Sequence, residues 1–209
     1  LRTTLAERLK GFGDSRYADV LRGDEVVQKM LKGDWPLYWA STYQFVSDDP
    51  LKVSMTKKEA ERTQVGSVLV PMLRAANTQT SIISPYFVPG KEVTRALTAM
   101  AQSGKQVRIL TNSLVANDVA AVHGGYSRYR EDLVEGDVQL WELKPVGGEK
   151  AESSMFGSSG ASLHTKAFAV DSRTLFVGSY NLDPRSTWLN CEQGVLVENA
   201  VLAVQLEEI

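Results

Sequence analysis

The segment LHTKAFAVDSRTLFVGSYN, residues 163–181, constrains the fold of this chain more than any other part of its sequence. Two runs within it, 166–170 and 174–179, are rich in apolar residues that alternate, which predicts two short β-strands. Asp171-Ser172-Arg173 lies between the runs, and these residue types are typical of a tight turn. The segment is therefore expected to form an antiparallel hairpin, because so short a connection cannot join parallel strands.

Polar side chains stand at matching positions around the two predicted strands. His164 and Lys166 are two residues apart, so they are expected to project from one face. Ser179 and Asn181 have the same spacing at the end of the second strand, and Glu192 follows eleven residues later, at the start of another strand-like run. The whole pattern reads H-x-K-x4-D-x6-G-S-x-N, and its side chains are predicted to meet in one concavity.

These residue types together favour phosphodiester chemistry. Phosphoryl transfer without a metal needs fixed positive charge, which Lys166 supplies, and hydrogen bonds, which Ser179 and Asn181 supply. The imidazole of His164 can act as a nucleophile or transfer protons. Glu192 is the candidate to fix the tautomer of that ring. No cluster with metal-ligand spacing is visible in the sequence, so neither a metal nor another cofactor is expected.

The aspartate of the pattern, Asp171, has a different interpretation. It belongs to the candidate catalytic set by its place in the pattern. However, it occupies a turn-forming position, where a turn or salt-bridge role is favoured over direct catalysis.

The pattern resembles that of the phospholipase D superfamily, whose members cleave or exchange phosphodiesters through a phosphohistidine intermediate. The resemblance implies that His164 is a nucleophile or general acid and that Lys166 and Asn181 bind phosphate. It also implies that Ser179 assists at the phosphate and that Glu192 orients His164. Asp171 is expected to be more structural.

Three further stretches narrow the resemblance to the C-terminal half of bacterial cardiolipin synthases, closest to the C type. They are SPYFVP at 84–89, residues 111–143 and SSGASLHTK at 158–166, and the similarity extends over 48–209. The resemblance implies a phosphatidyltransferase that makes cardiolipin from phosphatidylglycerol, with phosphatidylethanolamine as an alternative lipid. By analogy with this family, the candidate substrate-binding residues are Ser179, Tyr86, Asn112, Ser113, Asp118, His123 and Tyr126.

The motif occurs once in this chain, whereas the resemblance implies two copies on two facing lobes. The other histidine, His123, has Gly125 rather than a lysine two residues later, so it is not a second motif. It either lines the substrate pocket or ends a helix. His164, as the second motif's histidine, is expected to serve as general acid and base. A second lobe in the same protein, or a homodimer, is then required for activity.

Two domains are expected. Residues 1–45 are charged and helix-leaning, and they are interpreted as a connector from a missing upstream lobe, while 46–209 form the phospholipase D-like lobe, truncated at its C-terminus. The lobe is predicted to be α/β, with a mixed β-sheet sandwiched by helices, because helical and strand patterns alternate. The predicted elements are helices 59–76, 93–102, 118–133 and 200–209, strands 80–84, 106–111 and 138–143, and a Gly/Ser-rich loop at 145–162 that is either a lid or a surface loop.

Charge and hydropathy exclude some classes of partner. The net charge is −2, which disfavours nucleic acid. No apolar stretch of about 20 residues exists to span a bilayer. The resemblance therefore implies phospholipid substrates and peripheral contact with the cytoplasmic side of a bacterial inner membrane. Two alternatives remain open, namely a nuclease-like symmetric dimer and a catalytically incomplete fragment.

Overall fold

The computed structural model describes residues 13, 16–56, 58–59, 64–117, 119–144 and 162–208. It divides into two compact units, Leu1–Trp39 and Ala40–Ile209. The predicted Gly/Ser-rich loop at 145–162 and the candidate residue Asp118 lie outside the described residues, apart from Ser162.

The first unit contains two short helices, α2 (Arg16–Gly23) and α3 (Glu25–Leu31). Asp24 separates them and caps α3, because its carboxylate accepts a hydrogen bond from the backbone N–H of Val27 at 2.9 Å. No residue of α3 is buried.

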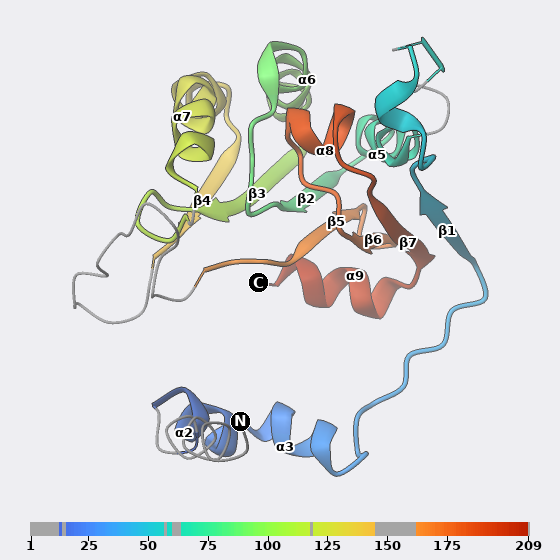
Figure 1. The fold of residues 1–209 in the computed structure, drawn as a ribbon, viewed down its shortest axis with the longest axis vertical. Helices are drawn as coiled ribbons and strands as arrows, with labels where there is room; N and C mark the ends of the chain where they lie inside the picture. Colours follow the sequence, from blue (N-terminus) through green and yellow to red (C-terminus); the bar gives the residue numbers. More distant parts are fainter. Residues whose placement is uncertain are drawn as a thin grey trace. The chain divides into compact units, whose positions relative to one another are not determined.

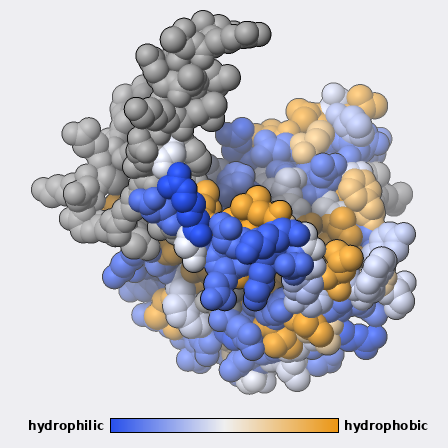
Figure 2. Space-filling model, turned by 90° about the horizontal axis from the view of Figure 1, so that it is seen from below, coloured by the Kyte–Doolittle hydropathy of each residue, from blue (hydrophilic) through white to orange (hydrophobic). Residues whose placement is uncertain are grey.

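On the face of the molecule that Figure 2 shows, hydrophobic residues are scattered among hydrophilic ones.

The second unit is built on one seven-stranded sheet in the order β1-β7-β6-β5-β2-β3-β4 (Figure 1). Strands β2, β3 and β4 are parallel to one another, and the remaining pairs are antiparallel, so the sheet is mixed as predicted. The strands are β1 (Tyr43–Ser47), β2 (Gln79–Ile83), β3 (Gln106–Asn112), β4 (Gln139–Leu143), β5 (Lys166–Val170), β6 (Thr174–Gly178) and β7 (Gln193–Glu198).

Helices cover both faces of this sheet, which confirms the predicted α/β sandwich. Helices α5, α6, α7 and α8 lie on the upper face in Figure 1, and α9 lies on the lower face against β5 and β6. Among the described residues, no helix is both long and apolar enough to cross a membrane. The helices are η1 (Lys52–Ser54, a 3-10 turn), α5 (Val65–Arg74), α6 (Gly90–Gln102), α7 (Ala120–Glu135), α8 (Pro184–Trp188) and α9 (Ala200–Glu207).

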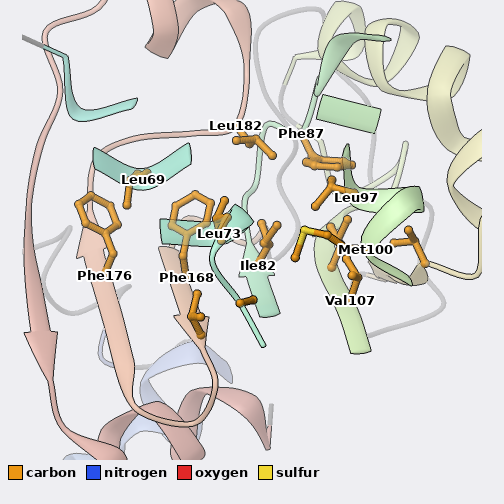
Figure 3. Close-up of a cluster of buried hydrophobic side chains, with 14 of the residues drawn as sticks. Leu69, Leu73, Ile82, Phe87, Leu97, Met100, Val107, Phe168, Phe176 and Leu182 are labelled. Carbon is orange, nitrogen blue, oxygen red and sulfur yellow. The ribbon is translucent and has the colours of Figure 1, made fainter. Parts of the chain in front are cut away.

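The main hydrophobic core lies between the upper helices and the sheet (Figure 3). Phe168 of β5 and Phe176 of β6 are fully buried, with ring centroids 5.7 Å apart. Leu69 and Leu73 of α5 belong to the same cluster and are also buried. Burial of side chains of this size contributes about 1.5–3 kcal/mol each, so this core fixes the strands that carry the motif.

The motif hairpin forms as the sequence predicts. β5 and β6 pair antiparallel, with Lys166 opposite Gly178 and Val170 opposite Thr174. The turn between them has positive φ at Asp171 (52°) and Ser172 (50°). Two successive left-handed residues are typical of a type I′ turn, whose twist matches that of the adjoining strands.

Several predicted boundaries differ from those in the structure. The helix expected from residue 59 is α5, which begins at Val65 after an extended Gln64. The helix expected from residue 93 begins three residues earlier, as α6. It ends as expected, since Gly104, with φ of 88°, lies just beyond its cap. The strand expected to include Glu192 is β7, which begins one residue after it, at Gln193.

Candidate active site

The candidate site lies at one end of the sheet, where four strands begin or end. β5 starts at Lys166, β6 ends at Gly178, β7 starts at Gln193 and β2 ends at Ile83. The antiparallel pairing of β5 with β2 and β6 places these termini at the same edge. The register of the sheet thus gathers side chains that are far apart in the sequence.

An open pocket of about 840 Å³ at this edge is lined by five of the six polar side chains that the pattern singles out, all except Asp171. Tyr86, one of the predicted substrate-binding residues, lines it as well. The pattern residues that line the pocket are His164, Lys166, Ser179, Asn181 and Glu192.

His164 and Lys166 lie together, as their spacing predicts. The Lys166 ammonium donates to the backbone carbonyl of His164 at 2.6 Å and lies 3.4 Å from its Nδ1 atom. His164 is exposed to the pocket, whereas Lys166 is only 8% exposed. An ammonium has no lone pair, so Nδ1 must accept, and the proton of the neutral ring then lies on Nε2.

Asn181 is held by its backbone and by one side-chain oxygen. Its N–H donates to the hydroxyl of Ser186 at 3.1 Å, and its Oδ1 accepts from the backbone N–H of Tyr86 at 3.3 Å. Within the described part of the chain, no hydrogen bond occupies its Nδ2 group. That group is therefore available to donate to a phosphate oxygen in the pocket.

Glu192 is buried and fully engaged by neighbouring side chains. Its Oε2 accepts from the hydroxyl of Ser179 at 2.5 Å, and its Oε1 accepts from Ser186 at 2.7 Å and Asn190 at 3.2 Å. Among the described residues, no hydrogen bond joins Glu192 to His164. The expected tautomer-fixing pair is therefore not formed in this structure, although both side chains line the same pocket.

Asn112, a predicted substrate contact, forms two hydrogen bonds to the backbone of Leu163. Its side chain donates to the carbonyl of Leu163 at 3.1 Å and accepts from the N–H of Leu163 at 2.9 Å. It is 2% exposed and does not line the pocket. This paired contact, typical of strand pairing, holds the backbone directly before His164.

Three other predicted substrate contacts, Ser113, His123 and Tyr126, also lie outside the pocket lining. The hydroxyl of Ser113 accepts from the N–H of Ala116 at 3.3 Å, within a turn after β3. Tyr126 is buried and donates to Glu142 at 2.9 Å, while His123 packs edge-on against its ring at 5.5 Å. Burial raises the pKa of Tyr126 above its ordinary value, and the hydrogen bond to Glu142 acts in the same direction.

Asp171 lies at the far end of β5 from the pocket. Its carboxylate accepts from the backbone N–H groups of Asn77, Thr78 and Gln79 at 2.8–3.1 Å and from the hydroxyl of Thr78. Desolvation raises the pKa of Asp171, but these hydrogen bonds together outweigh it and hold the pKa well below its ordinary value. Asp171 therefore connects the hairpin turn to the start of β2, in agreement with its interpretation as a turn residue.

An apolar row beside the site was not predicted from the sequence. Phe45 pairs with Val195, which pairs in turn with Val177, so three side chains form a line across β1, β7 and β6. They are 60%, 36% and 48% exposed, and all three line the pocket. Each strand shows alternating apolar residues, but only the register reveals that these three are adjacent.

The described residues contain no group of three or more His, Cys, Asp or Glu side chains placed to hold a metal ion. The pattern residues bring an imidazole, an ammonium, an amide, a hydroxyl and a carboxylate to the pocket. This set can bind a phosphate group and transfer protons to it.

Comparison with known proteins identifies relatives of this arrangement. A family model described as "Cardiolipin synthase, PLD-like domain" matches residues 69–209. Cardiolipin synthase C of Escherichia coli is 39% identical over 92% of this chain, and cardiolipin synthase A of Pseudomonas syringae is 29% identical over 88%. The chain spans only 41% and 36% of these two relatives.

Solved structures share the fold. Nuc, a phospholipase D family member from Salmonella typhimurium, matches 80% of this chain and 90% of its own chain, with a TM-score of 0.53 and 18% identity. NucT from Helicobacter pylori matches with the same TM-score and 16% identity. At these identities the likeness is one of fold.

Proposed function

The chain belongs to the cardiolipin synthase, phospholipase D-like domain family, and from this premise we propose that it supplies half of a phosphatidyltransferase site. The proposal rests on a single observation: one pocket gathers His164, Lys166, Ser179, Asn181 and Glu192. The reaction would transfer a phosphatidyl group to a hydroxyl of phosphatidylglycerol and so form cardiolipin.

Each step of this reaction has a group to carry it. Lys166 and the Nδ2 group of Asn181 would hold the non-bridging oxygens, where negative charge grows in the transition state. A histidine attacks phosphorus, and the bond to the leaving glycerol oxygen breaks as that oxygen takes up a proton. The hydroxyl of a second phosphatidylglycerol then loses its proton and attacks phosphorus, which frees the histidine.

We assign the proton transfers to His164. As an imidazolium, His164 gives a proton to the leaving oxygen, and the neutral ring that results takes a proton from the attacking hydroxyl. The nucleophile is then a second histidine. The sequence holds one other histidine, His123, which does not line the pocket. The second histidine therefore comes from another lobe of the same protein or from a second copy of this chain.

The surroundings of the pocket favour a lipid over a nucleic acid. Lys166 is the single cation among the described residues that line it, whereas a groove that follows a nucleic-acid backbone needs clustered lysines and arginines. Phe45, Val177 and Val195 instead offer an exposed apolar row that suits an acyl chain. We therefore place the protein at the surface of a bacterial inner membrane, on its cytoplasmic side.

The chain's two histidines provide a matched pair of variants. The chain would be prepared alone and by co-expression with a second motif-bearing lobe. Each preparation would be assayed on vesicles of phosphatidylglycerol, with and without phosphatidylethanolamine. Cardiolipin is measured by mass spectrometry. His164→Asn is expected to lower its formation by a factor of about 10³ or more, because a proton-transfer group is lost. His123→Gln alters the histidine outside the pocket and is expected to leave cardiolipin formation unchanged.

Two outcomes would contradict the proposal. One is equal cardiolipin formation by wild type and His164→Asn. The other is no lipid product from any combination together with cleavage of single-stranded DNA, which would instead support a nuclease. Activity that appears without a second lobe, in proportion to the dimer population, would identify the second copy as the source of the other histidine.

A further inference from the structure

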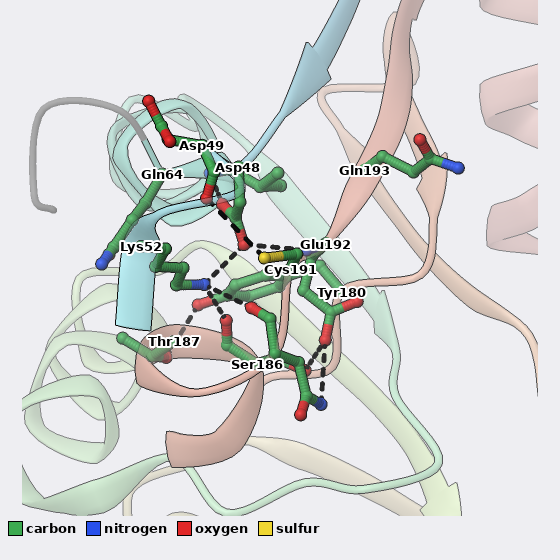
Figure 4. Close-up of polar contacts among 12 residues, drawn as sticks. Asp48, Asp49, Lys52, Gln64, Tyr180, Ser186, Thr187, Cys191, Glu192 and Gln193 are labelled. Atoms are coloured by element: carbon green, nitrogen blue, oxygen red, sulfur yellow. Dashed lines mark hydrogen bonds and ion pairs between the residues drawn. The ribbon is translucent and has the colours of Figure 1, made fainter. Parts of the chain in front are cut away.

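A buried ion pair lies behind the pocket, at the junction of β1 and η1. Asp48 directly follows β1, and Lys52 is the first residue of η1; both side chains are fully shielded from solvent. The Lys52 ammonium donates to Oδ2 of Asp48 at 2.5 Å (Figure 4). Neither residue lines the pocket. Removing two charges from water is costly, so the pair must be well satisfied by its other contacts.

Lys52 uses its remaining donors on the segment that carries α8. Its ammonium donates to the carbonyl of Ser186 at 2.7 Å and to that of Asn190 at 2.8 Å. An ammonium has three N–H groups, and the third donates to Asp48. One side chain thus fixes two points of the short stretch that leads to Glu192.

Asp48 fixes Glu192 from the other side. Its Oδ2 accepts from the N–H of Glu192 at 2.8 Å, and its own N–H donates to the carbonyl of Glu192, also at 2.8 Å. Its Oδ1 accepts from the N–H of Val65, the first residue of α5, at 2.6 Å. The backbone of Glu192 is therefore clamped to β1 and α5 through one carboxylate.

Ser186 joins this pair to two residues of the pocket. Its side chain is completely buried; the hydroxyl donates to Oε1 of Glu192 at 2.7 Å and accepts from the N–H of Asn181 at 3.1 Å. The Lys52 ammonium holds the carbonyl of the same serine. A displacement of Ser186 would therefore move Glu192 and Asn181 together.

We infer that Asp48, Lys52 and Ser186 are positioning residues, which set the placement of Glu192 and Asn181 in the active site. This inference rests on the proposed function, because it assigns those two side chains to the reacting phosphate. Removal of the Lys52 ammonium leaves the buried carboxylate of Asp48 without its counter-charge and takes a donor from two carbonyls, those of Ser186 and Asn190. The α8 segment must then shift to recover hydrogen bonds, and a shift of a fraction of an ångström is enough to weaken phosphate binding and catalysis.

Inorganic phosphate is a probe that tests this placement without catalysis. With two histidines in the sequence, the Cε1–Hε1 spectrum of the chain contains two signals, and His123→Gln assigns the one from His164. Titration with phosphate while following the His164 signal gives a Kd. We expect Lys52→Met and Ser186→Ala each to raise this Kd about tenfold.

The matched control is Lys105→Met. Lys105 also donates to a backbone carbonyl, that of Ala76 at 2.6 Å, but it does not line the pocket and is not part of this network. We expect its phosphate Kd to change by less than about twofold. Ser186→Cys keeps a weak donor of similar size and is expected to fall between wild type and Ser186→Ala.

Thermal unfolding separates positioning from general stability. Lys52→Met is expected to lower Tm more than Ser186→Ala, which removes no charge, and folded Ser186→Ala is still expected to weaken phosphate binding. In the lipid assay with a second lobe, Ser186→Ala is expected to lower kcat about tenfold with little change in KM.

The outcomes distinguish two failures. If wild type does not bind phosphate at His164, the proposed function fails. If wild type binds phosphate and folded Ser186→Ala binds it equally well with an unchanged kcat, the positioning inference fails while the proposed function stands.

Discussion

Gly178 and Gly194 lie directly opposite each other on β6 and β7, and the ring of Phe176 occupies the space beside them. A Cβ atom on Gly178 would come within 2.3 Å of the backbone oxygen of Gln193 and 2.7 Å of the Phe176 ring. The motif's glycine is therefore required by close packing. It allows β6 and β7 to stay paired just before Ser179 enters the pocket.

Gly178→Ala is accordingly expected to lower the free energy of unfolding by about 2–4 kcal/mol, because a backbone oxygen cannot move aside as a side chain can. Chemical denaturation measures this change. Gly124→Ala is the control, since a Cβ there meets nothing within 4 Å and the residue lies inside α7. It should stabilise the protein by about 0.5–1 kcal/mol. Similar values for both variants would contradict the packing argument.

Asp171→Asn should destabilise the protein by about 1–2 kcal/mol at neutral pH, because an amide NH₂ replaces an oxygen that faces backbone donors. The pKa of Asp171 is held low in the folded state, so its contribution is fully present above the unfolded pKa of about 4. This contribution is lost as pH falls through the folded pKa. The gap in unfolding free energy between wild type and variant is therefore constant above about pH 5 and narrows below about pH 4.

The control for that measurement is Asp137→Asn, at an exposed aspartate that also has positive φ (62°). Asparagine tolerates this backbone conformation as well as aspartate does, so little change is expected. A gap for Asp171→Asn that persists unchanged to pH 2 would show that the hydrogen bonds do not depend on the charged carboxylate.

Tyr126→Phe tests whether this residue contacts substrate, as the resemblance implied, or stabilises the fold, as its contacts indicate. Loss of the hydrogen bond to Glu142 should cost about 1 kcal/mol of stability. KM and kcat for cardiolipin formation should stay unchanged in the folded variant. An increased KM at unchanged stability would instead support the predicted substrate contact.

The hairpin and its polar residues could be predicted from the sequence because their information is local. Alternation predicts the strands of the motif, and a spacing of two residues places His164 beside Lys166. Asp171 was assigned to a turn for the same reason, since aspartate hydrogen-bonds to nearby backbone groups. The mixed sheet followed from the order of helical and strand patterns.

The support behind the site could not be predicted, because it depends on contacts distant in the sequence. Lys52 bonds to carbonyls 134 and 138 residues away, and no local pattern around Asp48 indicates its partners. The hydrogen bonds of Asn112 to the backbone of Leu163 also join residues 51 positions apart. A side chain that bonds to a backbone leaves no pattern in the partner's sequence.

The apolar row leads to the prediction that separates lipid from other phosphodiesters most directly. Phe45 is 60% exposed and lines the pocket, so an acyl chain that covers it would bury its ring. Burying a phenylalanine side chain contributes about 1.5–3 kcal/mol. Phe45→Asn should therefore lower kcat/KM for long-chain phosphatidylglycerol by a factor of about ten or more, since 1.4 kcal/mol corresponds to tenfold.

Tyr43→Asn is the matched control, because Tyr43 is exposed two residues earlier on the same face of β1 but does not line the pocket. Its kcat/KM should stay close to that of wild type. A monomeric short-chain phosphatidylglycerol, whose tails do not reach along the sheet, should react equally with wild type and Phe45→Asn. If Phe45→Asn slows both lipids equally, the residue acts on the reacting phosphate or on the fold, and the acyl chain lies elsewhere.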